Sequence, residues 1–222
     1  MELEWVILET SNYKSIIQIC NDSLQHSLFQ VLIGPPGVGK STALQMFKNA
    51  NRNEIILLIE LDKIFTAKKL YFELLKGLGI YDFDISLPLP VLAEKLVIVL
   101  REGRKKLIIV DDASRAGADM LEYWQHVRKF TSNNTGIILT GTSKFKDDFD
   151  KWVAQKKRGI PELASRIMNW TILSLPGKDE ILAVAKENGV TDSAELHSLI
   201  TCTDFRDLYN RVIMDGVKRP KL

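Results

Sequence analysis

A glycine-rich stretch behind an apolar run constrains the fold of this chain more than any other part of its sequence. Residues 31–42 read VLIGPPGVGKST and match the pattern G-x-x-x-x-G-K-[ST], with Gly34, Gly39, Lys40 and Ser41 at its fixed positions. Glycines let a backbone approach phosphate oxygens closely, and a helix that follows adds the positive end of its dipole. The stretch therefore predicts a phosphate-binding loop between a buried strand and a helix.

Each part of this loop has an expected task. Lys40 should reach the β- and γ-phosphates of a nucleotide, and the Ser41 hydroxyl should ligate Mg²⁺. The backbone amides of the loop should cradle the phosphates. The residues that we expect to hold the nucleotide are Pro36, Gly37, Val38, Gly39, Lys40, Ser41 and Thr42. The alternative is a glycine-rich turn that binds no ligand.

Short apolar runs alternate with helix-like segments along most of the chain. The runs are nearly continuous, which is typical of strands buried on both faces of a sheet. They cover residues 28–34, 54–61, 106–112, 136–141 and 169–175. Helices are predicted over residues 12–26, capped by Ser11 or Asn12, and over residues 40–49, 67–78, 89–103 and 116–131. This order predicts an α/β fold, with a parallel five-stranded sheet flanked by helices.

The pattern changes after residue 175. Three short helix-like segments follow without a strand, and the chain ends in the basic sequence VKRPKL. We therefore predict an N-terminal segment and helix (1–27), a nucleotide-binding core (28–175), a helical lid (176–216) and a basic tail (217–222).

Two adjacent aspartates end the apolar run LIIVDD. Asp111 should hold the shell of the Mg²⁺ ion, often through water. Asp112 is placed to orient the water that attacks the γ-phosphate. Many ATPases of this design carry glutamate there, and aspartate is one methylene shorter, so slow hydrolysis is expected. The alternative for either residue is a structural role at a strand end.

Further side chains are candidates for catalysis or for sensing the nucleotide. Thr142, with Thr140 as second choice, is placed to hydrogen-bond the γ-phosphate or the attacking water. Arg166, with Arg158 as its competitor, precedes the last strand; in ring or filament ATPases such an arginine reaches the γ-phosphate on a neighbouring subunit. Arg206, in the predicted lid, is placed to touch the nucleotide from the other side. The alternatives are a strand-end threonine and solvated arginines.

Composition narrows the setting. No apolar run approaches the ~20 residues of a membrane span, and the N-terminal sequence carries three glutamates instead of the basic start of a signal peptide. Cys20 and Cys202 are far apart, so we expect free thiols in a cytoplasmic protein without a membrane partner. The formal net charge of +2 does not by itself demand a nucleic-acid partner.

The quoted segments together resemble a known family. GPPGVGKST, LIIVDDAS, ILTGTS, ELASRI and a three-helix lid look like an AAA+ ATPase. More narrowly, the chain resembles the DNA-transposition ATPases typified by MuB, with TnsC and TniB as relatives. The stretch TGTSKFKDDFDKWVAQKKRGIPELASRI and the lid segment KDEILAVAKENGVTDSAELHSLI are similar to their counterparts in that branch. The resemblance covers roughly residues 6 to 215.

This resemblance implies ATP as the nucleotide, Mg²⁺ as the metal ion, and homo-oligomeric filaments or rings on double-stranded DNA with little sequence preference. It also implies recruitment and stimulation of a transposase. Asp112 replaces the usual glutamate, and Thr142 stands where such families often have asparagine. We expect no separate DNA-binding domain ahead of the core, unlike in MuB, and therefore expect DNA contacts from the core or the tail.

The expected DNA contacts follow the second strand and the two aspartates. Lysines and a hydroxyl group there would grip phosphates without reading bases. The candidates are Lys63, Thr66, Lys68, Lys69 and Arg115. A solvated helix start is the alternative reading of the first four. The basic run REGRKK (101–106) leads into a strand from its other end and is read as solvated.

Other functions fit some of the same features. A helicase loader or replication initiator of the AAA+ superfamily would share every nucleotide motif and differ in its partner. A scaffold that binds ATP with negligible hydrolysis is a further alternative because of Asp112. A small-molecule kinase needs a closing lid rich in arginines, and the predicted lid has few.

Overall fold

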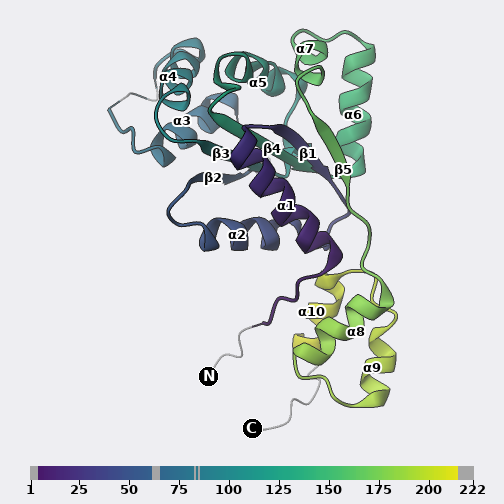
Figure 1. The fold of residues 1–222 in the computed structure, drawn as a ribbon. Helices are drawn as coiled ribbons and strands as arrows, with labels where there is room; N and C mark the ends of the chain where they lie inside the picture. Colours follow the sequence, from purple (N-terminus) through teal and green to yellow (C-terminus); the bar gives the residue numbers. More distant parts are fainter. Residues whose placement is uncertain (1–4, 62–65, 83, 85, 215–222) are drawn as a thin grey trace.

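The structure is a computed structural model, and it describes residues 5–61, 66–82, 84 and 86–214. Five parallel strands form one sheet in the order β2-β3-β4-β1-β5 (Figure 1). The strands are β1 (Phe29–Ile33), β2 (Ile55–Glu60), β3 (Lys106–Asp111), β4 (Thr135–Gly141) and β5 (Asn169–Ile172). The predicted fold class, a parallel five-stranded sheet flanked by helices, is confirmed. The continuous apolar runs of β1, β3 and β4 are buried along their full length, as the prediction required.

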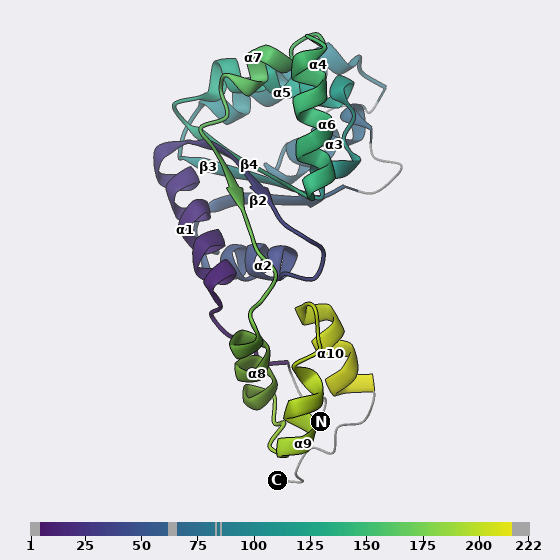
Figure 2. The ribbon, with the colours of Figure 1, turned by 90° about the vertical axis from the view of Figure 1, so that its right-hand side faces the viewer.

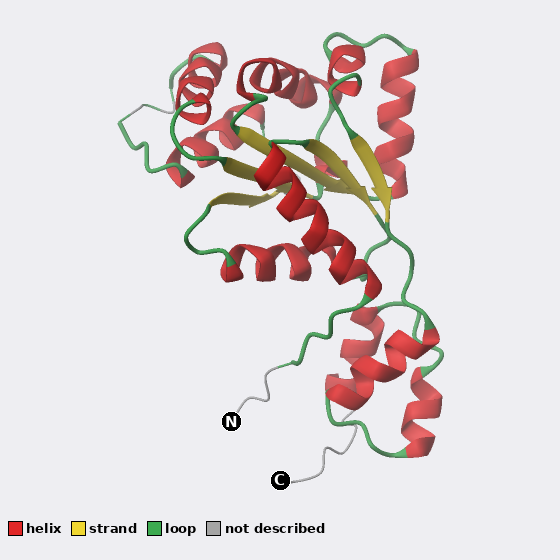
Figure 3. Ribbon diagram, in the orientation of Figure 1, coloured by secondary structure: helices red, strands yellow, loops and turns green. Residues whose placement is uncertain are grey.

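Helices cover both faces of the sheet (Figures 1 and 3). One face packs against α1 (Ser11–His26) and α2 (Lys40–Ala50), through a core that includes Leu44 and Phe47. The other face carries a larger core, which includes Trp124. The helices on that second face are α3 (Ala67–Gly77), α4 (Leu89–Arg101), α5 (Ala118–Thr131), α6 (Ser143–Ala154) and α7 (Ile160–Ala164). A short 3₁₀ turn, η1 (Ala113–Arg115), follows β3.

The carboxyl ends of the parallel strands share one edge of the sheet. The glycine-rich loop follows β1 there, Asp111 ends β3, and Thr142 follows β4. Functional side chains of open α/β sheets gather at this edge because every strand presents its loop there. The helix after the loop, α2, begins at Lys40 with Gly39 in the left-handed region at φ 90°.

Three helices form a second, smaller unit: α8 (Lys178–Glu187), α9 (Ser193–Leu199) and α10 (Phe205–Met214). They enclose their own apolar core, and they lie beyond the carboxyl edge of the sheet, at the opposite end of the molecule from α7 (Figures 1 and 2). We call this unit the lid. The N-terminal segment is attached to it, because Asn188 exchanges two hydrogen bonds with the backbone of Val6 (2.8 and 2.9 Å).

Some local expectations were wrong. The N-cap of α1 is Thr10, whose hydroxyl accepts from the Tyr13 amide at 3.3 Å, and neither Ser11 nor Asn12 has that role. The helix over Ser143–Ala154 was not predicted, and the last strand ends at Ile172 instead of residue 175. Lys106, expected in solvent, is buried, and its ammonium donates to the Glu102 and Arg104 carbonyls.

Both cysteines are free thiols, as expected. They lie in separate apolar cores, Cys20 beside the sheet and Cys202 in the lid. Burial raises the pKa of the Cys20 thiol to about 12, so this group carries no reactive thiolate near neutral pH. Among the described residues, no helix combines the length and the apolar character that crossing a membrane requires.

Candidate nucleotide site

A cavity of about 690 Å³ lies between the carboxyl edge of the sheet and the lid. Its polar part is lined by the glycine-rich loop together with Asp111, Asp112 and Thr142. Its apolar part is lined by the N-terminal segment and the lid, through side chains that include Trp5 and Tyr209. The cavity thus joins an anion-binding end to an aromatic end, which is the division of surface that a nucleotide needs.

The loop adopts backbone conformations that favour glycine. Gly37 and Gly39 have φ angles of 79° and 90°, where a side chain would be strained, and Val38 between them anchors the loop with only 1% of its surface exposed. The Lys40 ammonium donates to the carbonyls of Gly34 (2.7 Å) and Pro35 (2.8 Å). Lys40 is therefore held at the mouth of the loop.

Charged groups from both the core and the lid act on Lys40. Burial lowers its pKa, the carboxylates of Asp111 and Asp112 raise it, and the Arg206 guanidinium lowers it further. Arg206 also lines the cavity. The two cations therefore face the same space, one from the core and one from the lid, and both favour a bound polyphosphate.

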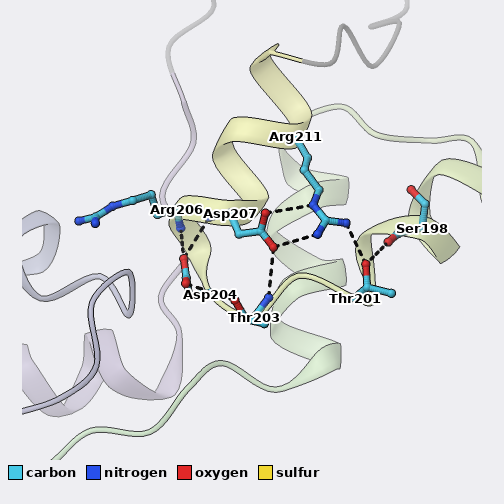
Figure 4. Close-up of polar contacts among 7 residues, drawn as sticks. All are labelled: Ser198, Thr201, Thr203, Asp204, Arg206, Asp207 and Arg211. Atoms are coloured by element: carbon cyan, nitrogen blue, oxygen red, sulfur yellow. Dashed lines mark hydrogen bonds and ion pairs between the residues drawn. The ribbon is translucent and has the colours of Figure 1, made fainter. Parts of the chain in front are cut away.

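Arg206 is directed into the cavity by the cap of α10. The Asp204 carboxylate accepts from the amides of Arg206 (2.8 Å) and Asp207 (3.0 Å), while Asp207 holds Arg211 through two hydrogen bonds. Figure 4 shows the Arg206 side chain extending away from this network. Within the described part of the chain, its guanidinium makes no hydrogen bond or ion pair, so it is available to a ligand.

The lid rests directly on the phosphate loop. The Phe205 amide donates to the Gly37 carbonyl at 3.1 Å, and a β-carbon at Gly37 would collide with the Asp204 carboxylate. The first turn of α10 is therefore placed by the loop itself. A change in the loop on nucleotide binding would be transmitted to the lid through this contact.

We predict that a Gly37→Ala variant weakens nucleotide binding by at least ~10-fold, because the new methyl group displaces the lid and the residue is strained at φ 79°. The loss should appear in titrations of the protein with a fluorescent ATP analogue. Gly117→Ala is the matched control, since a β-carbon there meets no atom within 4 Å and its φ is −78°. An unchanged affinity in Gly37→Ala would contradict the inferred docking of the lid.

Asp111 is set for an ion at the end of β3. Its Oδ1 accepts from the Thr140 hydroxyl and from the Asp112 amide at 3.0 Å, which fixes the carboxylate and leaves Oδ2 for another partner. Asp111 is 5% exposed and lines the cavity with the exposed Ser41. A carboxylate and a hydroxyl, with phosphate oxygens and water as the remaining ligands, fit Mg²⁺. No cluster of three acidic, histidine or cysteine ligands occurs among the described residues.

The two threonine candidates have different surroundings. Thr140 is fully buried, and its hydroxyl is occupied by Asp111 and by the Asp112 amide. Thr142 lines the cavity, where its amide donates to the Ser114 hydroxyl at 3.0 Å. Its own hydroxyl lies 3.4 Å from the same Ser114 oxygen. Thr142 is thus the threonine that faces the nucleotide space, and Thr140 positions Asp111.

Asp112 is not a free carboxylate. Its Oδ2 accepts from Nε of Arg115 in an ion pair, and its backbone is in the left-handed region at φ 56°. The Arg115 side chain is 39% exposed and lines the nucleotide cavity, and its predicted contact with DNA stays a prediction. The pairing of the two residues across one 3₁₀ turn was not foreseen, because the turn after β3 carries no signal in the sequence.

Arg166 is remote from the cavity of its own chain. It follows α7, and two residues later the Met168 amide donates to the carbonyl of Phe29, the first residue of β1. The phosphate loop follows the other end of β1. Nε of Arg166 is buried without an acceptor in the described part of the chain, and burial, with the nearby Arg166 charge, lowers the pKa of Arg128. The competitor, Arg158, pairs with Glu122 at 3.0 Å.

Aromatic and aliphatic side chains line the other end of the cavity. Trp5 packs edge-on against Tyr209 of the lid, with ring centroids 5.0 Å apart. Leu8, Tyr13 and Val184 line the same end. Aromatic and aliphatic surfaces of this kind accept a planar base. No periodicity marks these residues, since they come from an extended segment and from three helices, α1, α8 and α10, that lie apart in the sequence.

One acidic residue of the cavity was missed altogether. Glu60 ends β2, lines the cavity, and is paired in register with Asp111 on β3. The run EIILLIEL predicted the strand but gave no reason to single out its last carboxylate. Only the strand order, which places β2 beside β3, brings Glu60 to the site.

The remaining candidates for DNA contact lie around the start of α3. Thr66 caps this helix, accepting from the Lys69 amide at 3.2 Å, and Lys68 is in the first turn. The structure does not describe residue 63, so the prediction for Lys63 lies outside the described residues. These residues do not line the cavity, and their role in DNA binding stays a prediction.

Sequence comparisons find a family model and curated relatives to which this chain is similar. Residues 23–148 match the family model described as "AAA domain". Two curated relatives are the "ATP-dependent target DNA activator B" of Escherichia phage D108, 26% identical over 195 residues, and that of Escherichia phage Mu, 25% identical over 195 residues. Each alignment covers 86% of this chain and 59% of the relative, so the chain spans about three fifths of the length of these relatives.

The fold is also similar to solved structures. The Aeropyrum pernix ORC2 protein, solved as ADPNP–ADP complexes, superposes with a TM-score of 0.68 and 14% sequence identity. The superposition covers 98% of this chain and 66% of that chain. At this identity the likeness concerns the fold alone, and it includes the lid as well as the sheet.

Proposed function

This chain belongs to the AAA domain family, whose model matches more than half of its length, and on that premise we propose that it is an ATPase that binds duplex DNA in its ATP state and activates that DNA as a target for a transposase. The observation that carries the proposal is the cavity, which unites the phosphate loop, Asp111 and Arg206. Alignments that cover 86% of the chain relate it to two ATP-dependent target DNA activators. This similarity supports the choice of DNA as the partner.

The residues of one chain divide the work of holding the nucleotide. The loop amides and Lys40 bind the phosphates, and the Lys40 ammonium exchanges its two carbonyl partners for phosphate oxygens. Ser41 and Asp111 would hold Mg²⁺, which neutralises charge on the β- and γ-phosphates when bound. Arg206 adds a cation from the lid, so closure of the lid depends on the phosphates present.

A second copy would complete the catalytic site. Arg166 lies at the amino end of β1, away from its own cavity, and its guanidinium lacks an acceptor in the described part of the chain. An arginine in this state gains an ion pair when it meets the γ-phosphate of a neighbour, and it stabilises the transition state there. ATP therefore links adjacent copies, and loss of the γ-phosphate loosens them.

In this proposal, each copy contacts DNA weakly, and tight binding requires many linked copies. A single copy offers Thr66 and the lysines of the α3 region, which bind phosphates without reading bases. Copies linked through ATP would present these contacts side by side, and avidity would then raise the overall affinity by ~10²-fold or more. Binding should fall steeply with salt, because each phosphate contact releases a counterion.

The test is a titration of the protein into a fluorescent duplex of random sequence, followed by anisotropy with ATP, ADP or no nucleotide at two salt concentrations. We expect cooperative, salt-sensitive binding with ATP and at least ~10-fold weaker binding in the other two states. Lys40→Ala should behave like the nucleotide-free protein. Equal binding in all three states, or none in any state, would overturn the proposal.

A further inference from the structure

We propose that Glu60 is the general base of ATP hydrolysis, a role that rests on the proposed function and that places the base on β2 instead of directly after β3. Its carboxylate would accept the proton of the attacking water. The oxygen of that water forms a bond to the γ-phosphorus, the bond from the γ-phosphorus to the β,γ-bridging oxygen breaks, and ADP leaves with that electron pair. The proton then passes from Glu60 to solvent or to phosphate.

Strand register brings Glu60 to the reacting end of the nucleotide. Glu60 on β2 is paired with Asp111 on β3, and paired residues of neighbouring parallel strands project from the same face of a sheet. Asp111 is at the metal end of the cavity, and Glu60 lines the same cavity. The two carboxylates therefore stand side by side, one fixed by hydrogen bonds and the other exposed.

The surroundings of Glu60 suit a base. Within the described part of the chain, its carboxylate makes no hydrogen bond or ion pair, whereas Oδ1 of Asp111 has two donors. Its side chain is one methylene longer than that of aspartate and extends from the end of a strand. A carboxylate with free lone pairs, exposed to water in the nucleotide cavity, can accept a proton from a water molecule there.

The competing carboxylate is already engaged. Oδ2 of Asp112 is bound by the Arg115 guanidinium, and the side chain is short. The Asp112 backbone at φ 56° belongs to the turn that carries Arg115. Asp112 is thus assigned a positioning role, in which it directs the Arg115 charge into the nucleotide cavity, and Glu60 takes the proton.

The experiment measures steady-state phosphate release, with saturating ATP and duplex DNA, by the wild-type protein and by Glu60→Gln, Glu60→Asp, Asp112→Asn and Glu54→Gln. We expect Glu60→Gln to lower kcat by ~100-fold or more with unchanged affinity for ATP, since glutamine keeps the size and loses the base. Glu60→Asp should retain more turnover than Glu60→Gln. Asp112→Asn should lose less than ~10-fold, because it removes the charge paired with Arg115 and one of the two carboxylates near Lys40 but leaves the base in place.

Glu54 is the matched control, because it is exposed at the other end of the same strand, where it pairs with Arg104 at 3.3 Å. Its variant should turn over like the wild type. If wild-type protein turns over and Glu60→Gln does as well, the assignment of Glu60 fails while the proposed function stands. Weaker Mg²⁺-dependent ATP binding in Glu60→Gln would also overturn it, in favour of a metal-binding role. If the wild-type protein itself releases no phosphate, the proposed ATPase function fails.

Discussion

An Arg166→Ala variant should lose ~10³-fold in ATP turnover, and its affinity for ATP as a dilute protein should stay unchanged. The affinity should stay unchanged because Arg166 lies at the amino end of β1 and does not line the nucleotide cavity of its own chain. A guanidinium supplied by a neighbour stabilises the charge that develops on the transferred phosphoryl group, and its removal costs ~10³ to 10⁵ in kcat in phosphoryl-transfer enzymes. Phosphate release and titration with a fluorescent ATP analogue measure the two quantities.

Arg158→Ala provides the control for this prediction. Arg158 is 90% exposed and pairs with Glu122, so its removal costs one surface ion pair and little else. If Arg158→Ala lost most of its turnover and Arg166→Ala kept wild-type turnover, Arg158 would be the arginine that acts on the neighbouring nucleotide. A loss of ATP affinity in dilute Arg166→Ala would place the residue in its own nucleotide site and contradict the proposed assembly.

A Lys40→Ala variant should bind ATP ~100-fold more weakly and show no measurable turnover. Lys40 supplies the one ammonium group inside the loop, and a hydrogen bond between charged groups is worth about 1.5–3 kcal/mol, or roughly one to two orders of magnitude in affinity. Loss of its charge also removes the favourable interaction with the developing charge on the γ-phosphate. Equilibrium titration with a fluorescent ATP analogue measures the change.

Lys48→Ala is the matched control, since Lys48 lies in the last turn of the same helix and does not line the cavity. Its affinity for ATP should equal that of the wild type. ATP binding by Lys40→Ala at wild-type strength would show that the glycine-rich loop is not the phosphate site.

The parts of this molecule that the sequence predicted are those in which neighbours along the chain decide the structure. The loop from Gly34 to Ser41 combines glycine conformations with the start of a helix, so its residues suffice to predict its shape. The strands were predicted because a short, continuous run of β-branched residues is typical of a strand that is buried on both faces of a parallel sheet. Their ends were placed within a few residues.

The parts that were missed depend on contacts between distant segments. Thr10 caps α1 in place of Ser11, because Ser11 donates its amide and its hydroxyl to Glu180 of the lid, both at 2.8 Å. Lys106 is buried because the carbonyls of a preceding turn accept its protons. Neither partner can be inferred from local pattern.

The candidate site shows the same division. Asp111 was predicted from the strand that it ends, and the structure places it beside the loop. The ion pair of Asp112 with Arg115 depends on the conformation of a single turn, and Glu60 reaches the site through the order of the strands. A carboxylate on a strand that carries no motif becomes a candidate for catalysis only once the sheet is known.

The central claim is that two copies of this chain, linked through ATP on DNA, make one complete catalytic site. The most direct test is the rate of ATP hydrolysis per copy, measured across a wide range of protein concentrations with and without duplex DNA. We expect this rate to rise with concentration, and DNA to shift the rise to lower concentration, because Arg166 must come from a neighbour. A rate per copy that is independent of concentration and of DNA would show that each chain hydrolyses ATP alone and would contradict the account.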